Sequence, residues 1–119
     1  MNMATATKPQ VSKAFQNERR IVRAIVKDAI ADGCVISVHD GEEWMIKRSD
    51  KITHVMGAIM ATGSDNLKIR DAATGEYVGT VAFIYGNGSN GADVIADYTL
   101  GERMEKIMER GFKMACALC

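Results

Sequence analysis

The run of residues 86–91 has the spelling best suited to chemistry in this chain, because it reads G-x-G-x-x-G after an apolar segment. In dinucleotide-binding proteins this fingerprint follows a strand, opens a helix and leads to a second parallel strand. Here residues 92–98 read as another strand, and only one helix can follow before residue 119, so no β-α-β unit can close. We therefore predict a mobile glycine-rich hairpin loop, with an anion held on its backbone amides as the less favoured alternative.

A histidine and three carboxylates gather at a second predicted turn, namely His39, Asp40, Glu42 and Glu43. Such a set could bind a divalent metal or perform acid–base catalysis, but a hairpin tip of this composition is more typically solvated. His54 falls near the polar side of a predicted helix and has no evident partner in the sequence. Because no nucleophile, base and orienting group can be named together, we predict that the protein is not an enzyme and has no cofactor or metal.

The three cysteines suggest little chemistry. Cys34 lies in a strand pattern and is predicted to be a small buried apolar residue. Cys116 and Cys119 spell C-x-x-C, which could be a redox pair, half of a zinc site or a prenylation box. A zinc site needs two more ligands, and a redox pair favours a helix N-terminus, so we prefer coincidence. A small metal- or redox-active protein using these two cysteines stays as an alternative.

A row of cations forms the main candidate binding surface. Arg20, Arg23 and Lys27 line one side of a predicted helix and could contact phosphates or an acidic partner. Loop residues are the other usual contact positions. The candidate partner-binding residues are Arg19, Arg20, Arg23, Lys27, Asn87, Ser89 and Asn90.

The composition predicts one soluble globular domain. The chain has 119 residues with 15 basic and 15 acidic side chains, so it lacks the overall basic excess of a dedicated nucleic-acid binder. No apolar run approaches the ~20 residues of a membrane span. Residues 1–10 are polar and are expected to form a disordered tail rather than a secretory signal, with a single domain over residues 11–119. The odd cysteine number then favours a reducing cytoplasm.

Hydrophobic spacing predicts three helices. The first is expected between Ser12 as N-cap and Gly33 as stop, and the second runs from a cap at Ser49 or Asp50 to Gly63. The third is expected to begin at a capping box formed by Thr99 with Glu102, and to end or kink at Gly111.

Alternating residues predict five strands. A hairpin is expected over residues 34–47, with a three-residue loop that pairs Ile36 with Trp44 and Cys34 with Ile46. A three-strand meander is expected over residues 66–98. Its first strand reads as edge-like or half-exposed, and its second as a candidate for the sheet centre. Gly79 reads as a bulge or a close approach by a helix.

The predicted fold class is α+β, in the order α-ββ-α-βββ-α, with helices mainly on one face of an antiparallel sheet. The expected core residues are Ile25, Ile36, Trp44, Ile46, Val55, Ile59, Ile69, Val81, Phe83 and Met104.

Three phrases, VISVHDGEEWMIKRS, LKIRDAATGEYVGTVAFIYGNG and DVIADYT, cover about half of the chain. In these phrases the chain resembles small uncharacterised proteins of proteobacterial phages and prophages. The resemblance implies a mobile-element accessory protein in the cytoplasm of a bacterial host, and implies no activity for any residue.

We therefore expect a non-enzymatic accessory protein that binds and inhibits or remodels a bacterial host protein complex, in the manner of an anti-defence or anti-CRISPR protein. A nucleic-acid-binding accessory protein that uses the basic helix face is the alternative. We expect no membrane partner, and a homodimer is left open.

Overall fold

The computed structural model describes residues 12–119, so the predicted disordered tail over residues 1–10 lies outside the described part of the chain. Helices and strands follow in the order α1 (Lys13–Ala31), β1 (Cys34–His39), β2 (Trp44–Ser49), α2 (Ile52–Ala58), β3 (Ser64–Asp71), β4 (Tyr77–Ile84), β5 (Ile95–Tyr98) and α3 (Glu102–Cys116). This order confirms the predicted α-ββ-α-βββ-α arrangement.

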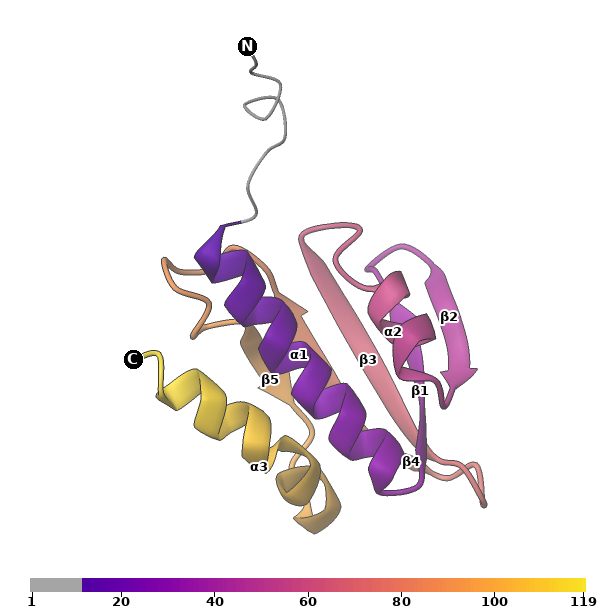
Figure 1. Cartoon of the computed structure of the whole chain (residues 1–119). Helices are drawn as coiled ribbons and strands as arrows, with labels where there is room; N and C mark the ends of the chain where they lie inside the picture. Colours follow the sequence, from indigo (N-terminus) through magenta and orange to yellow (C-terminus); the bar gives the residue numbers. More distant parts are fainter. Residues whose placement is uncertain (1–11) are drawn as a thin grey trace.

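The strands form one antiparallel sheet in the order β2-β1-β3-β4-β5. The three described helices lie against the same face of this sheet (Figure 1), with α1 and α3 packed side by side and α2 over β1 and β2. The fold is therefore α+β with two layers, and the opposite face of the sheet carries none of the described helices.

Helix α1 begins and ends where its sequence predicts. The Ser12 hydroxyl oxygen accepts a hydrogen bond from the Phe15 amide at 3.0 Å, and this satisfies one of the free amides of the first turn. After Asp32, Gly33 adopts a φ of 81°, a conformation that favours glycine, and turns the chain into β1.

The hairpin register differs from the prediction. His39 pairs with Trp44, Val38 with Ile46 and Ile36 with Ser49. The carboxylate of Asp40 accepts the amides of Glu42 and Glu43, which closes a four-residue loop in place of the predicted three. The changed parity turns Trp44 away from the core, where its exposed fraction is 42%.

The centre of the sheet is β3 and not β4, because β3 lies third of the five strands. Of the two alternatives for this strand, the half-exposed one is confirmed and the edge position is wrong, because buried Leu67 and Ile69 alternate with Lys68 between a covered and a bare face of the sheet. The expectation at Gly79 is confirmed, since a Cβ atom there would lie 2.6 Å from the Met104 sulfur of α3.

Four predicted helix boundaries differ from those in the structure. Helix α2 has no side-chain cap and ends at Ala58, and the Met60 amide beyond it donates to the Asp65 carboxylate at 2.8 Å. The N-cap of α3 is Gly101, because the Thr99 hydroxyl accepts a hydrogen bond from the Thr80 amide across the sheet instead of capping the helix. Gly111 does not end α3, which continues to Cys116.

The core lies between the helices and the covered face of the sheet. Of the residues predicted there, Trp44 is exposed and Ile46 is half-buried at the margin, and the other eight are buried. Buried residues that were not in the prediction include Val22, Val26, Val38, Leu67, Ile107 and Met108.

Candidate functional site

The glycine-rich loop is held against α1. The Glu18 carboxylate accepts a hydrogen bond from the Gly86 amide at 2.8 Å, and the Asn17 amide group donates to the Asn90 carbonyl at 2.9 Å. Gly91 lies so close to α1 that a Cβ atom would be 2.8 Å from the Ala14 carbonyl oxygen. The prediction of a mobile loop overlooked this docking.

Of the three loop residues predicted to bind a partner, Asn87 and Ser89 are exposed. Asn90 is half-buried, and its side-chain amide donates to the Leu118 carbonyl at the end of the chain. The carboxylate of Glu18 is the anion on the Gly86 amide, so this part of the loop has an internal partner.

The predicted hairpin tip forms no assembled acid–base group. Asp40 is engaged by two backbone amides of its own turn, which lower the pKa of its carboxyl group. The His39 Nδ1 atom accepts the Gly41 amide, and its ring packs edge-on against Trp44 at a centroid distance of 4.9 Å. Among residues 12–119, no group of three or more His, Cys, Asp and Glu side chains is arranged to hold a metal ion.

The predicted basic row is brought into a groove between α1 and α3. Arg20, Arg23 and Lys27 line a hollow of about 180 Å³ together with Arg110 from α3. An adjoining hollow of about 190 Å³ shares Arg20 with it. We call the two together the α1–α3 groove; the apolar and small residues lining it are Ile21, Ala24, Met114, Ala117 and Leu118.

Contacts with neighbouring groups decide which cations contribute free positive charge to the groove. Arg19 points away from it, toward α2, where its guanidinium donates to the Met56 carbonyl, so the structure separates Arg19 from the other candidate cations. Asp28 accepts two hydrogen bonds from Arg110, which leaves Arg20, Arg23 and Lys27 as the cations of the groove for which no carboxylate partner is found in the described residues. The rim therefore stays positive.

The C-terminal cysteines lie at the carbonyl end of α3. Cys116 and Cys119 are exposed and unbonded, and the Cys119 thiol lies 3.7 Å from the Ala115 carbonyl. A redox pair favours a helix N-terminus, whereas this pair lies at the opposite end of α3. Cys34 is buried as predicted, and burial raises the pKa of its thiol.

The bare face of the sheet is the surface that sequence reasoning missed. The Lys68 ammonium lies 5.9 Å from the centroid of the Trp44 ring and 5.7 Å from that of the Tyr77 ring. The Arg70 guanidinium lies 5.9 Å from the same Tyr77 ring. Because Lys68 and Arg70 flank the fully buried Ile69, both side chains leave the sheet on the side away from the core. We call Trp44, Lys68, Arg70 and Tyr77 the aromatic–cation face.

A shallow hollow of about 230 Å³ lies on the same side of the sheet, lined by polar groups from β3, β4 and β5. Asn66, Thr80 and Asp97 contribute an amide, a hydroxyl and a carboxylate to it. The Tyr77 hydroxyl lies 2.6 Å from the Thr80 hydroxyl, so the hollow adjoins the aromatic–cation face. The alternation of Lys68 and Arg70 with Leu67 and Ile69 was the available signal for this surface.

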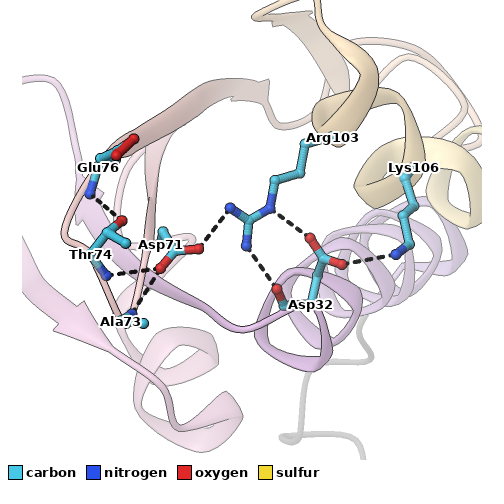
Figure 2. A network of polar contacts seen from close by, with 7 residues as sticks. All are labelled: Asp32, Asp71, Ala73, Thr74, Glu76, Arg103 and Lys106. Atoms are coloured by element: carbon cyan, nitrogen blue, oxygen red, sulfur yellow. Dashed lines mark hydrogen bonds and ion pairs between the residues drawn. The ribbon is translucent and has the colours of Figure 1, made fainter.

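A further polar cluster joins three elements around Arg103. Figure 2 shows its guanidinium between the carboxylates of Asp32 and Asp71, each at 2.8 Å, with a third hydrogen bond to the Asp32 carbonyl. Lys106 binds the second oxygen of Asp32 at 3.0 Å, and the Thr74 and Ala73 amides bind Asp71. We call this set the Arg103 clamp.

The clamp shifts the pKa values of its members. Amides of the turn and Arg103 lower the pKa of Asp71 to about 2, and hydrogen bonds from Arg103 and Lys106 lower that of Asp32. A hollow of about 360 Å³ lies beside Asp71 and Arg103. Both carboxylates are already engaged by donors of the fold, which supports a structural role for the clamp.

Comparisons with protein-family models, with curated proteins and with solved structures find no match. Among the described residues, no helix is both long and apolar enough to cross a membrane.

Proposed function

We propose that the protein is a small non-enzymatic accessory protein of a phage or mobile element, which binds and inhibits or remodels a protein complex in the cytoplasm of a bacterial host. The host context rests on the phrases that resemble phage and prophage proteins. The observation that supports a binding role is the α1–α3 groove, which gathers Arg20, Arg23, Lys27 and Arg110 around an apolar floor.

The groove is suited to an acidic segment of a protein partner. Ile21 is buried beneath it, and Met114 and Leu118 are half-buried and add flexible apolar surface. Protein interfaces combine such an apolar centre with a polar rim and are enriched in arginine and methionine. A segment that carries both carboxylates and an apolar anchor would match the floor and the rim together.

Nucleic acid is the second candidate for the same groove. The structure adds Arg110 to the predicted basic row, so several cations could face one phosphate backbone. A phosphate backbone gains no favourable contact from an apolar floor. We therefore favour a protein partner over nucleic acid. No observation favours metal or redox chemistry at Cys116 and Cys119.

The decisive experiment is affinity purification from a proteobacterial host, followed by mass spectrometry. We expect a stoichiometric host protein that is retained by the wild type and lost by the double variant Arg20→Gln with Arg23→Gln. The control is Arg19→Gln, which removes one positive charge from the neighbouring position outside the groove and is compared with Arg20→Gln alone. Equal recovery by the double variant, or equal loss by the control, would contradict the proposal.

A salt titration separates the two candidates. If the groove binds DNA or RNA duplexes, the affinity will fall steeply as salt rises, with a logarithmic slope of roughly −0.9 for each phosphate contact. Recovery of nucleic acid with no stoichiometric protein, abolished by the double variant, would replace the leading proposal with the second one.

A further inference from the structure

We propose that the aromatic–cation face binds single-stranded nucleic acid, with bases stacked on Trp44 and Tyr77 and phosphates against Lys68 and Arg70. This site lies on the opposite side of the molecule from the α1–α3 groove and goes beyond the function proposed for the groove. The inference rests on the side chains that the sheet brings together from β2, β3 and β4.

The two rings are placed for stacking. The exposed fractions of Trp44 and Tyr77 are 42% and 48%, which is unusual for large aromatic side chains in a domain with a well-packed core. One ammonium, that of Lys68, lies near both rings, so two bases of one strand can reach them. Every base has a π-face, and successive bases stacked on aromatic side chains are the usual mode of single-strand recognition.

Cations lie where the backbone of such a strand would run. Arg70 lies over Tyr77 and donates to the Gly75 carbonyl at the turn between β3 and β4. Arg48 reaches the same turn, since its guanidinium would lie 4.0 Å from a Cβ atom at Gly75. Together with Lys68 between the rings, these residues place three cations along the expected path of the nucleic-acid backbone. A bound phosphate would draw the Lys68 ammonium away from the rings.

The adjoining hollow offers hydrogen bonds for the edge of one base. Asn66 can both donate and accept, the Thr80 hydroxyl can do either, and the Asp97 carboxylate accepts from an exocyclic amino group. Asp97 would repel a phosphate, so the base and not the backbone must enter the hollow. The bases of the bound nucleic acid, and not its phosphates, would therefore face β5.

The composition favours a nucleic acid over a protein or a second copy of the chain. Lysine is depleted at the centre of protein interfaces because its compact charge is costly to desolvate. Here Lys68 occupies the centre of the face, between the two rings. The phosphates of a nucleic acid would pair with the Lys68 ammonium, whereas an apolar partner would bury that charge without a partner.

Trp44 is the single tryptophan of the chain, so its fluorescence reports directly on this face. We expect saturable quenching on titration with oligothymidine or oligouridine of about ten nucleotides. Tyr77→Ala should weaken binding by about tenfold, while Tyr77→Phe keeps the ring and should stay close to the wild type. Lys68→Gln should weaken binding and reduce the salt slope by roughly 0.7.

The matched control is Lys113→Gln, which removes the same charge from an exposed position of α3 on the helical side of the molecule. Circular dichroism of each variant separates lost binding from lost folding. Absence of quenching by the wild type would overturn the proposal, as would affinities equal in Tyr77→Ala and Tyr77→Phe. A concentration-dependent dimer that shields Trp44, with no effect of oligonucleotide, would assign the face to a second copy instead.

Discussion

Arg103 ties together three parts of the chain that are far apart in sequence. Its guanidinium binds Asp32 at the end of α1 and Asp71 at the end of β3, while Arg103 itself lies in the first turn of α3 (Figure 2). The geometry is that of charge-assisted hydrogen bonds, which are stronger than neutral ones and fix orientation. The clamp is thus expected to hold the start of α3 in place.

The clamp is expected to make the free energy of unfolding depend on pH in the acid range. The pKa of Asp71 is about 2 in the folded protein and near 3.8 when the group is unperturbed, and the pKa of Asp32 is lowered too. Lowered values mean that the stabilisation is complete above about pH 4 and is lost as the pH falls toward 2. We expect Arg103→Gln to lower the free energy of unfolding at pH 7 and to flatten this acid dependence.

Urea denaturation between pH 2 and pH 7 measures both effects. Asp71 keeps its turn amides in the variant, so part of the pH dependence should persist. Lys113→Gln serves as the control for the loss of a surface cation. Identical pH profiles for Arg103→Gln and the wild type would show that the clamp does not stabilise the fold.

Asp65 contrasts with Asp32 and Asp71, because its carboxyl group is fully buried in β3. One of its oxygens accepts the Tyr85 hydroxyl at 2.6 Å and the Met60 amide at 2.8 Å. The other oxygen has no partner among residues 12–119. Burial raises the pKa of Asp65, and burial with hydrogen bonding to Asp65 raises that of Tyr85. A raised pKa means that this group favours folding less as the pH rises above about 4.

We expect Asp65→Asn to be less destabilising than Asp65→Ala at pH 7, because the amide oxygen can still accept both hydrogen bonds. Asp65→Ala should instead lower the free energy of unfolding by about 2 kcal/mol or more, since it leaves two donors unpaired. Thermal and urea denaturation of both variants measures the difference. An Asp65→Asn variant as unstable as Asp65→Ala would contradict this account of the two hydrogen bonds.

At the scale of elements, the packing of α3 on α1 depends on Gly111. A Cβ atom at this position would lie 2.5 Å from the Ile25 side chain, closer than real contacts allow. The missing side chain therefore lets the two helices approach each other. Glycine has a low helix propensity, and the close packing of the two helices offsets that cost.

Gly111→Ala should lower the free energy of unfolding by about 1–3 kcal/mol, because the added methyl group overpacks the helix contact. Gly57→Ala is the matched substitution in α2, where no atom of the described part of the chain outside α2 itself lies within 4 Å of the added Cβ. Alanine there should stabilise the protein by roughly 0.5–1 kcal/mol through helix propensity. Chemical denaturation of both variants tests the pair, and equal signs for the two would contradict this account of the packing.

At the scale of the whole molecule, the sheet has one covered and one bare face (Figure 1). The covered face contributes fully buried residues such as Ile36, Leu67 and Phe83, while the bare face carries Trp44 and Tyr77. The glycine-rich loop reaches back from the β4–β5 end of the sheet to α1, which joins the two layers at one edge. Both proposed binding surfaces are products of this layering.

Hydrogen exchange should follow the sheet order. Amides of β3 pair on both sides, with β1 and β4, and we expect them to be among the slowest to exchange. The edge strands β2 and β5 should exchange faster. The Gly86 amide should be protected for a loop position because it donates to Glu18, and Glu18→Ala should remove that protection. Equal exchange across all strands would argue against this sheet order.

The sequence by itself determined the order of the elements, the antiparallel meander and most of the core. Helix α1 could be predicted with both of its ends because the apolar stripe, the Ser12 cap and the Gly33 stop are local signals. Residue-to-residue alternation likewise separated Leu67 and Ile69 from Lys68. Such patterns are set by the backbone geometry of one element and need no knowledge of its neighbours.

Only the tertiary structure decided which face Trp44 occupies, where Arg19 points and what holds the glycine-rich loop. Two of these depend on residues distant in sequence, because Met56 draws Arg19 toward α2 and Glu18 engages Gly86. The face of Trp44 depends on the Asp40 turn, whose side-chain hydrogen bonds shift the hairpin register. A shift of one residue in a strand reverses its faces, so a small local error moved Trp44 from the bare face into the predicted core. The candidate surfaces were therefore beyond local patterns, because a surface exists only once distant elements are packed together.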